Sequence, residues 1–260
     1  MRAAVVRRTA LAASAVTLAL LVSACGGSSD DDAKGAGKSA AAGSAASKSD
    51  AAASDVKALS AAELEKASLT AADLKGYQVT TMKDGERGTA DQVTVDKAEC
   101  LPVALALGLV EREEAVASTA RQAMPKPDAS AATADDPLAA ISLVTSAVSL
   151  SSYDGADASE VLAEMKKTAA ECTGFTATVQ GEKTVYSKVA EVPVSGGEEA
   201  LGLNLAMESD GDSVPMSLVL VRQAGTVATI ATADMSGATG GTAENELPTE
   251  IISAQVAKLA

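Results

Sequence analysis

The most reactive side chains in this sequence are three cysteine thiols, at Cys25, Cys100 and Cys172. A thiol can be acylated, can pair in a disulfide or can stay free, and an odd number in an exported protein leaves one cysteine outside any internal pair. Cys25 differs from the others because it closely follows an N-terminal apolar run, Thr9–Val22, which is itself preceded by three arginines. This layout is typical of a secretory signal. The run is too short to cross a bilayer, which needs about 20 apolar residues.

The residues Val22, Ser23, Ala24 and Cys25 resemble the lipobox of bacterial lipoprotein signals. The resemblance implies that the Cys25 thiol takes a diacylglyceryl group and that cleavage removes residues 1–24, leaving an N-terminus that carries palmitate or similar chains. Two or more acyl chains anchor a protein stably, whereas one chain binds only marginally. We therefore expect a protein anchored on the outer face of the cell membrane through lipid on Cys25. An ordinary secretory signal that ends at a cysteine is the alternative.

Once Cys25 is assigned to lipid, Cys100 and Cys172 remain as a pair in an oxidising compartment. We predict that they form a disulfide. The bridge would close a loop of about 70 residues, for which chain entropy gives a stabilisation of about 4 kcal/mol. Two free buried thiols are the alternative.

The remaining candidates for chemistry favour turns and solvated loops over catalysis. Glu208–Asp212 has oxygen ligands that suit calcium, but it lacks the closing glutamate of an EF-hand and lies where a hairpin turn is expected. Asp30–Asp32 and Asp135–Asp136 fall in predicted tether and loop. Gly196–Gly197 and Gly237–Gly241 come without a phosphate-loop lysine or a dinucleotide fingerprint. We predict a protein that is not an enzyme and uses no cofactor or metal.

Composition and charge exclude one class of partner. Residues 1–24 hold three of the 21 basic residues and none of the 35 acidic ones, so residues 25–260 carry a formal charge of −17. Such a surface repels phosphate backbones, and we exclude nucleic acid as a partner. The sequence has no histidine, which is the commonest general base and metal ligand. It has three Tyr, one Phe and no Trp, so the core must be aliphatic and stacking platforms are scarce.

Composition also divides the chain into a signal peptide, a tether and a folded domain. Residues 1–24 are the signal peptide. Residues 25–55 hold the lipid anchor and a run of small and polar residues, which cannot offset the entropy of ordering and should be disordered. Residues 56–260 are predicted to form an α+β domain, with a mainly antiparallel sheet, flanking helices and one disulfide.

Capping signals and 3.6-residue spacing predict the helices that position the two cysteines. The first expected helix starts at Ser60–Glu63, and the second runs from Asp96 or Lys97 to Val110. The third starts at Asp157–Glu160, the fourth starts near Pro248, and Leu69–Gly76 forms one further helical turn. Cys100 and Cys172 fall on apolar faces of the second and third helices. The fourth should bury Ile252, Val256 and Leu259.

Period-two alternation predicts the strands. The expected strands are Tyr77–Met82, Gln92–Val95, Ile141–Ser152, Phe175–Val179, Thr184–Val194, Ala200–Glu208, Val214–Arg222 and Thr226–Asp234. The last five form an antiparallel meander whose hairpin turns include Asp210–Gly211 and Ala224–Gly225. Pro125, Pro127 and Pro137 mark a long loop.

From Leu69 onward the chain resembles the PknH-like extracellular sensor domain, which occurs on actinobacterial kinases and in small lipoproteins. The matching segments, in order, are Leu69–Leu74 with Gly76–Tyr77, Ala98–Cys100, Glu171–Phe175, Gly197–Leu201 and Val219–Ala231. The resemblance implies a disulfide-braced, mainly antiparallel sheet with helices beside it and a cleft for ligands. The chain departs from the family in having one available cysteine pair rather than two, and no kinase domain.

These observations lead to the hypothesis of a non-catalytic, membrane-anchored module that binds a small ligand or an envelope component, through residues that the sequence does not identify. Two alternatives stay open. One is a lipid or glycolipid carrier similar to the mycobacterial LppX/LprG group, which would need an apolar cavity. The other is a regulatory partner of an envelope enzyme or kinase.

Overall fold

The computed structural model describes residues 55–83, 85–131, 140–179, 181–209, 211–236 and 246–260, all of which belong to a unit running from Ser44 to Ala260. Its centre is a nine-stranded sheet in the order β1-β3-β4-β9-β8-β7-β6-β5-β2, in which each neighbouring pair is antiparallel. The strands are β1 (Tyr77–Thr81), β2 (Val93–Val95), β3 (Ala117–Pro125), β4 (Val144–Ser152), β5 (Phe175–Val179), β6 (Glu182–Val192), β7 (Glu199–Ser209), β8 (Asp212–Gln223) and β9 (Thr226–Asp234).

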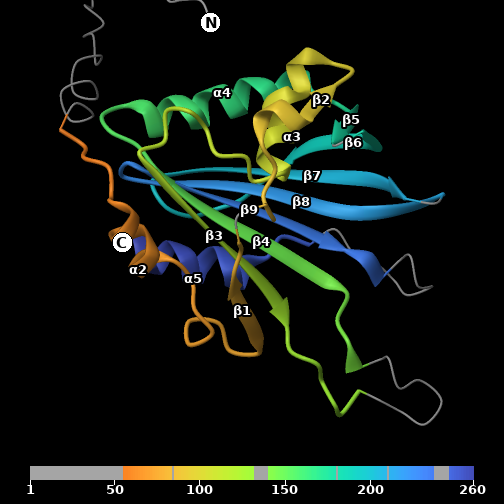
Figure 1. Cartoon of the computed structure of the whole chain (residues 1–260). Coiled ribbons are helices and arrows are strands. Elements are labelled where there is room, and N and C mark those ends of the chain that lie inside the picture. The colour runs from red at the N-terminus through yellow and green to blue at the C-terminus, as the bar shows by residue number, and fades with distance from the viewer. Residues whose placement is uncertain (1–54, 84, 132–139, 180, 210, 237–245) are drawn as a thin grey trace, which may run out of the picture. The chain divides into compact units, whose positions relative to one another are not determined.

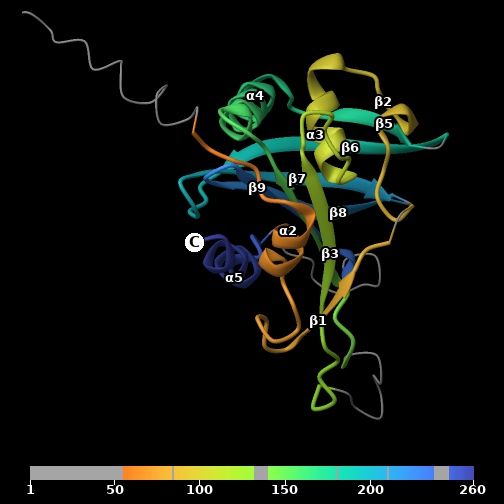
Figure 2. The ribbon, with the colours of Figure 1, turned by 60° about the vertical axis from the view of Figure 1, so that its left-hand side comes forward.

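Helices cover both faces of this sheet, as Figures 1 and 2 show. They are α2 (Ala61–Ala67), α3 (Leu101–Leu107), α4 (Asp157–Glu171) and α5 (Thr249–Leu259), with the 3-10 turns η1 (Ala90–Gln92) and η2 (Ala98–Cys100). One face carries α3 and α4, and the other carries α2 and α5. The predicted fold class, α+β with a mainly antiparallel sheet, flanking helices and one disulfide, is confirmed.

Strand β8 lies at the centre because its residues are apolar on both faces. Leu218 and Leu220 pack under α3 and α4, whereas Val219 and Val221 pack against α5, and all four are at most 2% exposed. Full burial of such a side chain contributes roughly 1.5–3 kcal/mol. The stretch Leu218–Val221, which is apolar on both faces, therefore lies in the middle of three layers.

The disulfide between Cys100 and Cys172 is present, with 5.2 Å between the two Cα atoms. Cys100 is the N-cap residue of α3, and Cys172 is the C-cap residue of α4. Both are fully buried. The bridge thus ties the start of one helix to the end of the other above the same face of the sheet.

Several local predictions were wrong. Strand β3 was missed, and Pro125 is its last residue rather than part of a loop. The predicted helix ending at Val110 is split into η2 and α3, and Leu109 after it has a positive φ of 50°. Leu69–Gly76 forms turns rather than a helical turn, although Gly76 does take a positive φ of 83°.

The turn between β8 and β9 uses its glycine for space rather than for its backbone angle. Ala224 holds the positive φ of 48°. A Cβ on Gly225 would lie 2.6 Å from the carbonyl oxygen of Tyr153 and 2.7 Å from Cγ1 of Val56, a separation that real structures avoid. Gly225 therefore allows the chain before α2 to pass close to the sheet.

Helix α5 buries the predicted residue Ile252, and Val256 and Leu259 are half-buried and pack against the core as expected. Ile251 and Gln255, which were not predicted, are also at most 1% exposed. The glutamine can be buried because its side-chain amide donates a 2.8 Å hydrogen bond to the carbonyl oxygen of Ala67, at the end of α2. No helix in the described part of the chain is long and apolar enough to cross a bilayer.

Candidate ligand-binding site

The two helices joined by the disulfide frame a pocket of about 300 Å³ over the sheet. The helices converge at Cys100 and Cys172, and the pocket lies between α3, α4 and strands β4, β8 and β9. Its described lining residues are Ala90, Leu101, Pro102, Leu105, Ala106, Leu109, Val110, Glu111, Arg112, Glu113, Glu114, Ser149, Ser151, Tyr153, Val161, Glu164, Met165, Leu220, Val227 and Thr229.

The floor of this α3–α4 pocket consists of hydroxyl and aliphatic side chains from neighbouring strands. Ser149, Thr229 and Leu220 stand directly opposite one another across β4, β9 and β8. Ser151 and Val227 form the next row on the same face. Alternate residues of a strand point to the same face, so the polar groups are few and fixed by the register of the sheet.

The walls are mainly aliphatic. Leu105 and Ala106 of α3 are half-buried and line one side, while Val161 and Met165 of α4 line the other and are at most 6% exposed. Tyr153, 2% exposed, follows β4. Burial raises the pKa of the Tyr153 hydroxyl, and its hydrogen bond with Ser151 opposes that rise. The tyrosine therefore keeps its proton at neutral pH.

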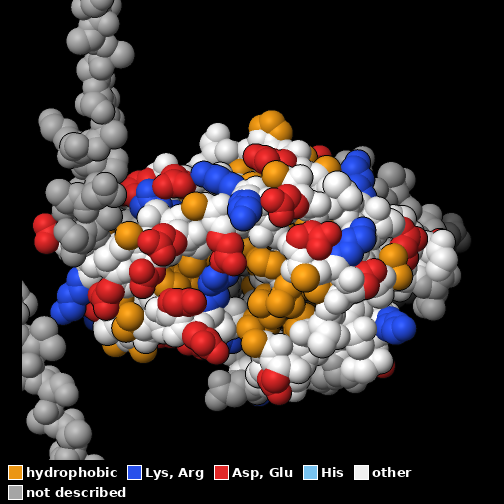
Figure 3. All heavy atoms as spheres, turned by 90° about the horizontal axis from the view of Figure 1, so that it is seen from above, with side chains coloured by type: hydrophobic (Ala, Val, Ile, Leu, Met, Phe, Trp, Pro, Cys, Tyr) orange, Lys and Arg blue, Asp and Glu red, His pale blue; other side chains and the backbone are white. Residues whose placement is uncertain are grey.

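The rim of the pocket is charged and mostly acidic. Glu111, Arg112, Glu113 and Glu114 follow α3, and Glu164 projects from α4. The Arg112 guanidinium donates to the Glu164 carboxylate, which connects the segment after α3 to α4. Figure 3 looks down on this face and shows apolar side chains gathered in a hollow among charged ones. The excess of carboxylates disfavours an anionic ligand.

One donor on this rim lacks a hydrogen bond. The Nε atom of Arg112 is buried and has no hydrogen-bond partner among the described residues, although it forms an ion pair with the Glu114 carboxylate, whose Oε2 lies 3.7 Å away. A buried donor without a hydrogen bond costs about 1–3 kcal/mol. A bound molecule that presented a carbonyl or hydroxyl oxygen to Nε would remove this cost.

This arrangement suits a small apolar molecule with a hydrogen-bond acceptor. Small-molecule sites are concave, mostly apolar and carry a few fixed polar groups, with volumes of roughly 300–1,000 Å³. The α3–α4 pocket is at the lower end of that range. Its polar groups are the hydroxyls of Ser149, Ser151, Thr229 and Tyr153, and the Nε of Arg112.

Of the site residues predicted from the sequence, the structure brings Cys100 and Cys172 together next to this pocket. Cys25 lies outside the described residues, as do Asp30–Asp32, Asp135–Asp136 and Gly237–Gly241. In the Glu208–Asp212 segment, Ser209 pairs with Asp212 across the end of the β7–β8 hairpin. Asp210 lies outside the described residues.

Sequence reasoning missed the pocket residues Arg112, Ser149, Ser151 and Thr229. One usable signal was present, because Val148 to Ser151 alternates serine with valine and leucine on a strand that reads as central. Serines on one face of a central strand predict a polar patch inside the fold. No comparable signal marks Arg112, whose position depends on how the segment after α3 folds back over α4.

The extracellular domain of PknH from Mycobacterium tuberculosis has a similar fold, with a TM-score of 0.52 and 10% sequence identity. The match covers 78% of this chain and 95% of that domain. An uncharacterised protein from Mycobacterium smegmatis, the Rv0999 ortholog, has a TM-score of 0.35 and 11% identity, over 76% of this chain and 94% of that one. No family model and no curated protein sequence matches the chain. A PknH-like fold is thus supported by structure.

Proposed function

We propose that this chain is a non-catalytic, lipid-anchored module of the cell surface that binds a small, uncharged, mainly apolar molecule in the α3–α4 pocket. The observation that carries the proposal is Arg112, which lines the apolar cavity and whose buried Nε has no hydrogen-bond partner among the described residues. The Nε donor favours a ligand with an oxygen acceptor, and the aliphatic walls favour a ligand that is mainly hydrocarbon. The carboxylates of the rim select against negative charge.

The setting of the module comes from two further observations. The fold is similar to that of an extracellular domain, which agrees with export. The lipobox-like residues Val22 to Cys25 support anchoring through lipid on Cys25, and the polar run after them would serve as a tether. A sensor-like role on the outer face of the membrane combines these features.

The volume of the pocket bears on the lipid-carrier alternative. At about 300 Å³ the cavity is at the lower limit for small molecules, and this favours a small molecule over a lipid with several long chains. Regulation of an envelope enzyme or kinase would be compatible with ligand binding.

A fluorescence titration with Nile red, an uncharged apolar dye, tests the proposal on the unit 44–260. We expect saturable fluorescence with the unchanged chain and a large loss with Ala106→Phe, because the new ring fills the pocket. The matched control is Ala257→Phe, which adds the same ring at an exposed site on α5. Equal fluorescence from both variants would contradict the proposal.

A further inference from the structure

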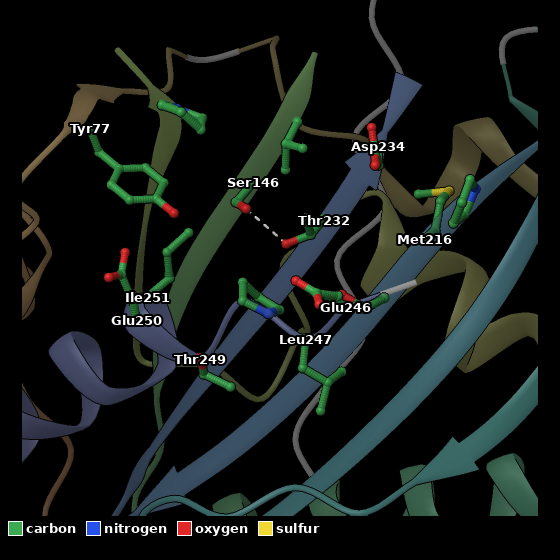
Figure 4. A pocket seen from close by; sticks show the side chains of 15 residues that line it. Tyr77, Ser146, Met216, Thr232, Asp234, Glu246, Leu247, Thr249, Glu250 and Ile251 are labelled. Atoms are coloured by element: carbon green, nitrogen blue, oxygen red, sulfur yellow. Dashed lines mark hydrogen bonds between the residues drawn. The ribbon is translucent and has the colours of Figure 1, made fainter. Parts of the chain in front are cut away.

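A second pocket, of about 450 Å³, lies on the opposite face of the sheet, where the segment leading into α5 passes over β4, β9 and β8 (Figure 4). It shares no lining residue with the α3–α4 pocket. We call it the α5 pocket. Both pockets carry carboxylates and hydroxyls, but the described lining of the α5 pocket lacks the arginine of the first pocket.

The floor of the α5 pocket is a row of hydroxyls. Ser146, Thr232 and Ser217 lie directly opposite one another on β4, β9 and β8. Ser146 and Thr232 hydrogen-bond to each other at 2.8 Å, as the dashed line in Figure 4 marks.

The third hydroxyl of this row, on Ser217, is unused. Ser217 is 1% exposed and lines the pocket, and its Oγ has no hydrogen-bond partner in the described part of the chain. A buried hydroxyl without a partner costs about 1–3 kcal/mol. It therefore points to a ligand that offers a hydrogen bond at this place.

Three carboxylates surround the hydroxyl row. Asp234 follows Thr232 by two residues on β9, Glu246 comes from the segment that leads into α5, and Glu250 lies in the first turn of α5. None of the described residues that line the pocket is Lys or Arg. Burial, followed by the nearby charge of Glu250, raises the pKa of the Tyr77 hydroxyl. The pocket is therefore electronegative, and it favours a cation.

The walls show which kind of cation fits. Val144, Leu247 and Ile251 supply apolar surface, and the ring of Tyr77 stands at one side, where an aromatic face can attract a cation. Among the described residues, no group of three or more acidic, Cys or His side chains is placed to hold a metal ion. The carboxylates are spread apart, with hydroxyl and hydrocarbon surface between them. Such a lining suits an organic cation, whose carbon chain can contact the apolar surface while its charged groups face the carboxylates.

We propose that the α5 pocket binds a small organic ammonium ion of the polyamine class, with N–H donors directed at Asp234, Glu246 and the Ser217 hydroxyl. An ammonium group has three donors and no acceptor, which matches a pocket that offers carboxylate and hydroxyl oxygens. Its methylene chain would lie against the aliphatic walls. This site is independent of the α3–α4 pocket and of the ligand proposed there.

Isothermal titration calorimetry with spermidine tests this proposal on the full-length chain in an uncharged maltoside detergent. We expect saturable binding at up to millimolar spermidine. Asp234→Asn and Glu246→Gln should each weaken binding about tenfold, because each removes a charge-assisted hydrogen bond. Ser217→Ala should weaken it about threefold, since it removes an uncharged acceptor.

The control is Glu182→Gln, which makes the same change of charge at an exposed site on β6, outside the pocket. It should leave spermidine affinity unchanged. An equal loss with Glu182→Gln, the absence of saturable heat, or displacement of spermidine by equimolar Ca²⁺ would each overturn the proposal. NMR of the unchanged chain, which has three tyrosines, gives a test without variants: spermidine should shift the ring signals of Tyr77, and unshifted signals would overturn the proposal.

Discussion

Cys100 and Cys172 join the residue before α3 to the residue after α4, and the α3–α4 pocket lies between the same two helices. The bridge spans a sequence separation of 72 residues. The bridge is thus a long-range crosslink, and it also fixes the two helices that line the candidate site.

Replacing both cysteines tests the first of these roles. The double variant Cys100→Ala/Cys172→Ala should lower the free energy of unfolding by about 4 kcal/mol, because the unfolded chain regains the entropy of a large loop. Urea unfolding, followed by circular dichroism, measures the change. Reduction of the unchanged chain should have a similar effect, and a loss below about 1 kcal/mol would show that the bridge contributes little.

Two serines of the same row on the sheet should respond in opposite ways to the same substitution. Ser217→Ala should raise the free energy of unfolding by about 1 kcal/mol, because it removes a buried hydroxyl that has no hydrogen-bond partner among the described residues. Ser146→Ala should lower it by about 1 kcal/mol, since it breaks the bond to Thr232. Urea unfolding of the ligand-free variants provides the comparison. A destabilisation of equal size in both would contradict the account of Ser217.

The ion pair between Arg121 and Glu65 should make stability depend on pH. Arg121, 6% exposed, connects β3 to α2 by donating to Glu65, and this hydrogen bond is the main reason why the pKa of Glu65 is lowered from its usual value of 4.5. A lowered folded-state pKa adds stability above 4.5, and that stability is lost as the pH falls through the lowered value.

The substitution Glu65→Gln removes this dependence. The Glu65 side chain is 57% exposed, so solvent screening limits the loss at neutral pH to at most about 1 kcal/mol. The difference in free energy of unfolding between the unchanged chain and Glu65→Gln should shrink as the pH falls below 4.5. Urea unfolding over a pH series measures it, with Glu182→Gln as the control. A difference that stays constant with pH would exclude the ion pair as its source.

Lipidation of Cys25 has a direct test in cells. The unchanged chain should sediment with membranes, and intact mass should show diacylglyceryl and acyl groups on a chain that starts at Cys25. Cys25→Ser should leave a chain without acyl groups by intact mass, because the variant has no thiol to take them. An unchanged chain whose intact mass shows no acyl groups would contradict lipid anchoring.

The meander β5 to β9 could be predicted from sequence because its strands alternate clearly or contain apolar stretches. Leu201, Leu203 and Leu205 are at most 1% exposed, on the face that their spacing predicts. The cysteine count also led to the correct pair. These features depend on local pattern or on simple arithmetic, and tertiary contacts did not alter them.

Strand β3 and the two pockets could not be predicted in the same way. The buried residues of β3 are Ala120, Arg121 and Ala123, and small or charged side chains give no apolar alternation. Each pocket combines strands with a helix or segment distant in sequence, so its residues come together only through the order of the sheet. Gln255 illustrates the same limit, since its burial depends on a carbonyl 188 residues away.

Methyl NMR on methionine-labelled chain tests the central claim most directly, because Met165 lies in the α3–α4 pocket and Met207 lies on β7, outside the described lining of both pockets. On addition of Nile red, the account predicts that the Met165 methyl signal shifts with a saturable dependence and that the Met207 signal stays in place. An unchanged Met165 signal at saturating dye, or equal shifts of both signals, would contradict binding in the α3–α4 pocket.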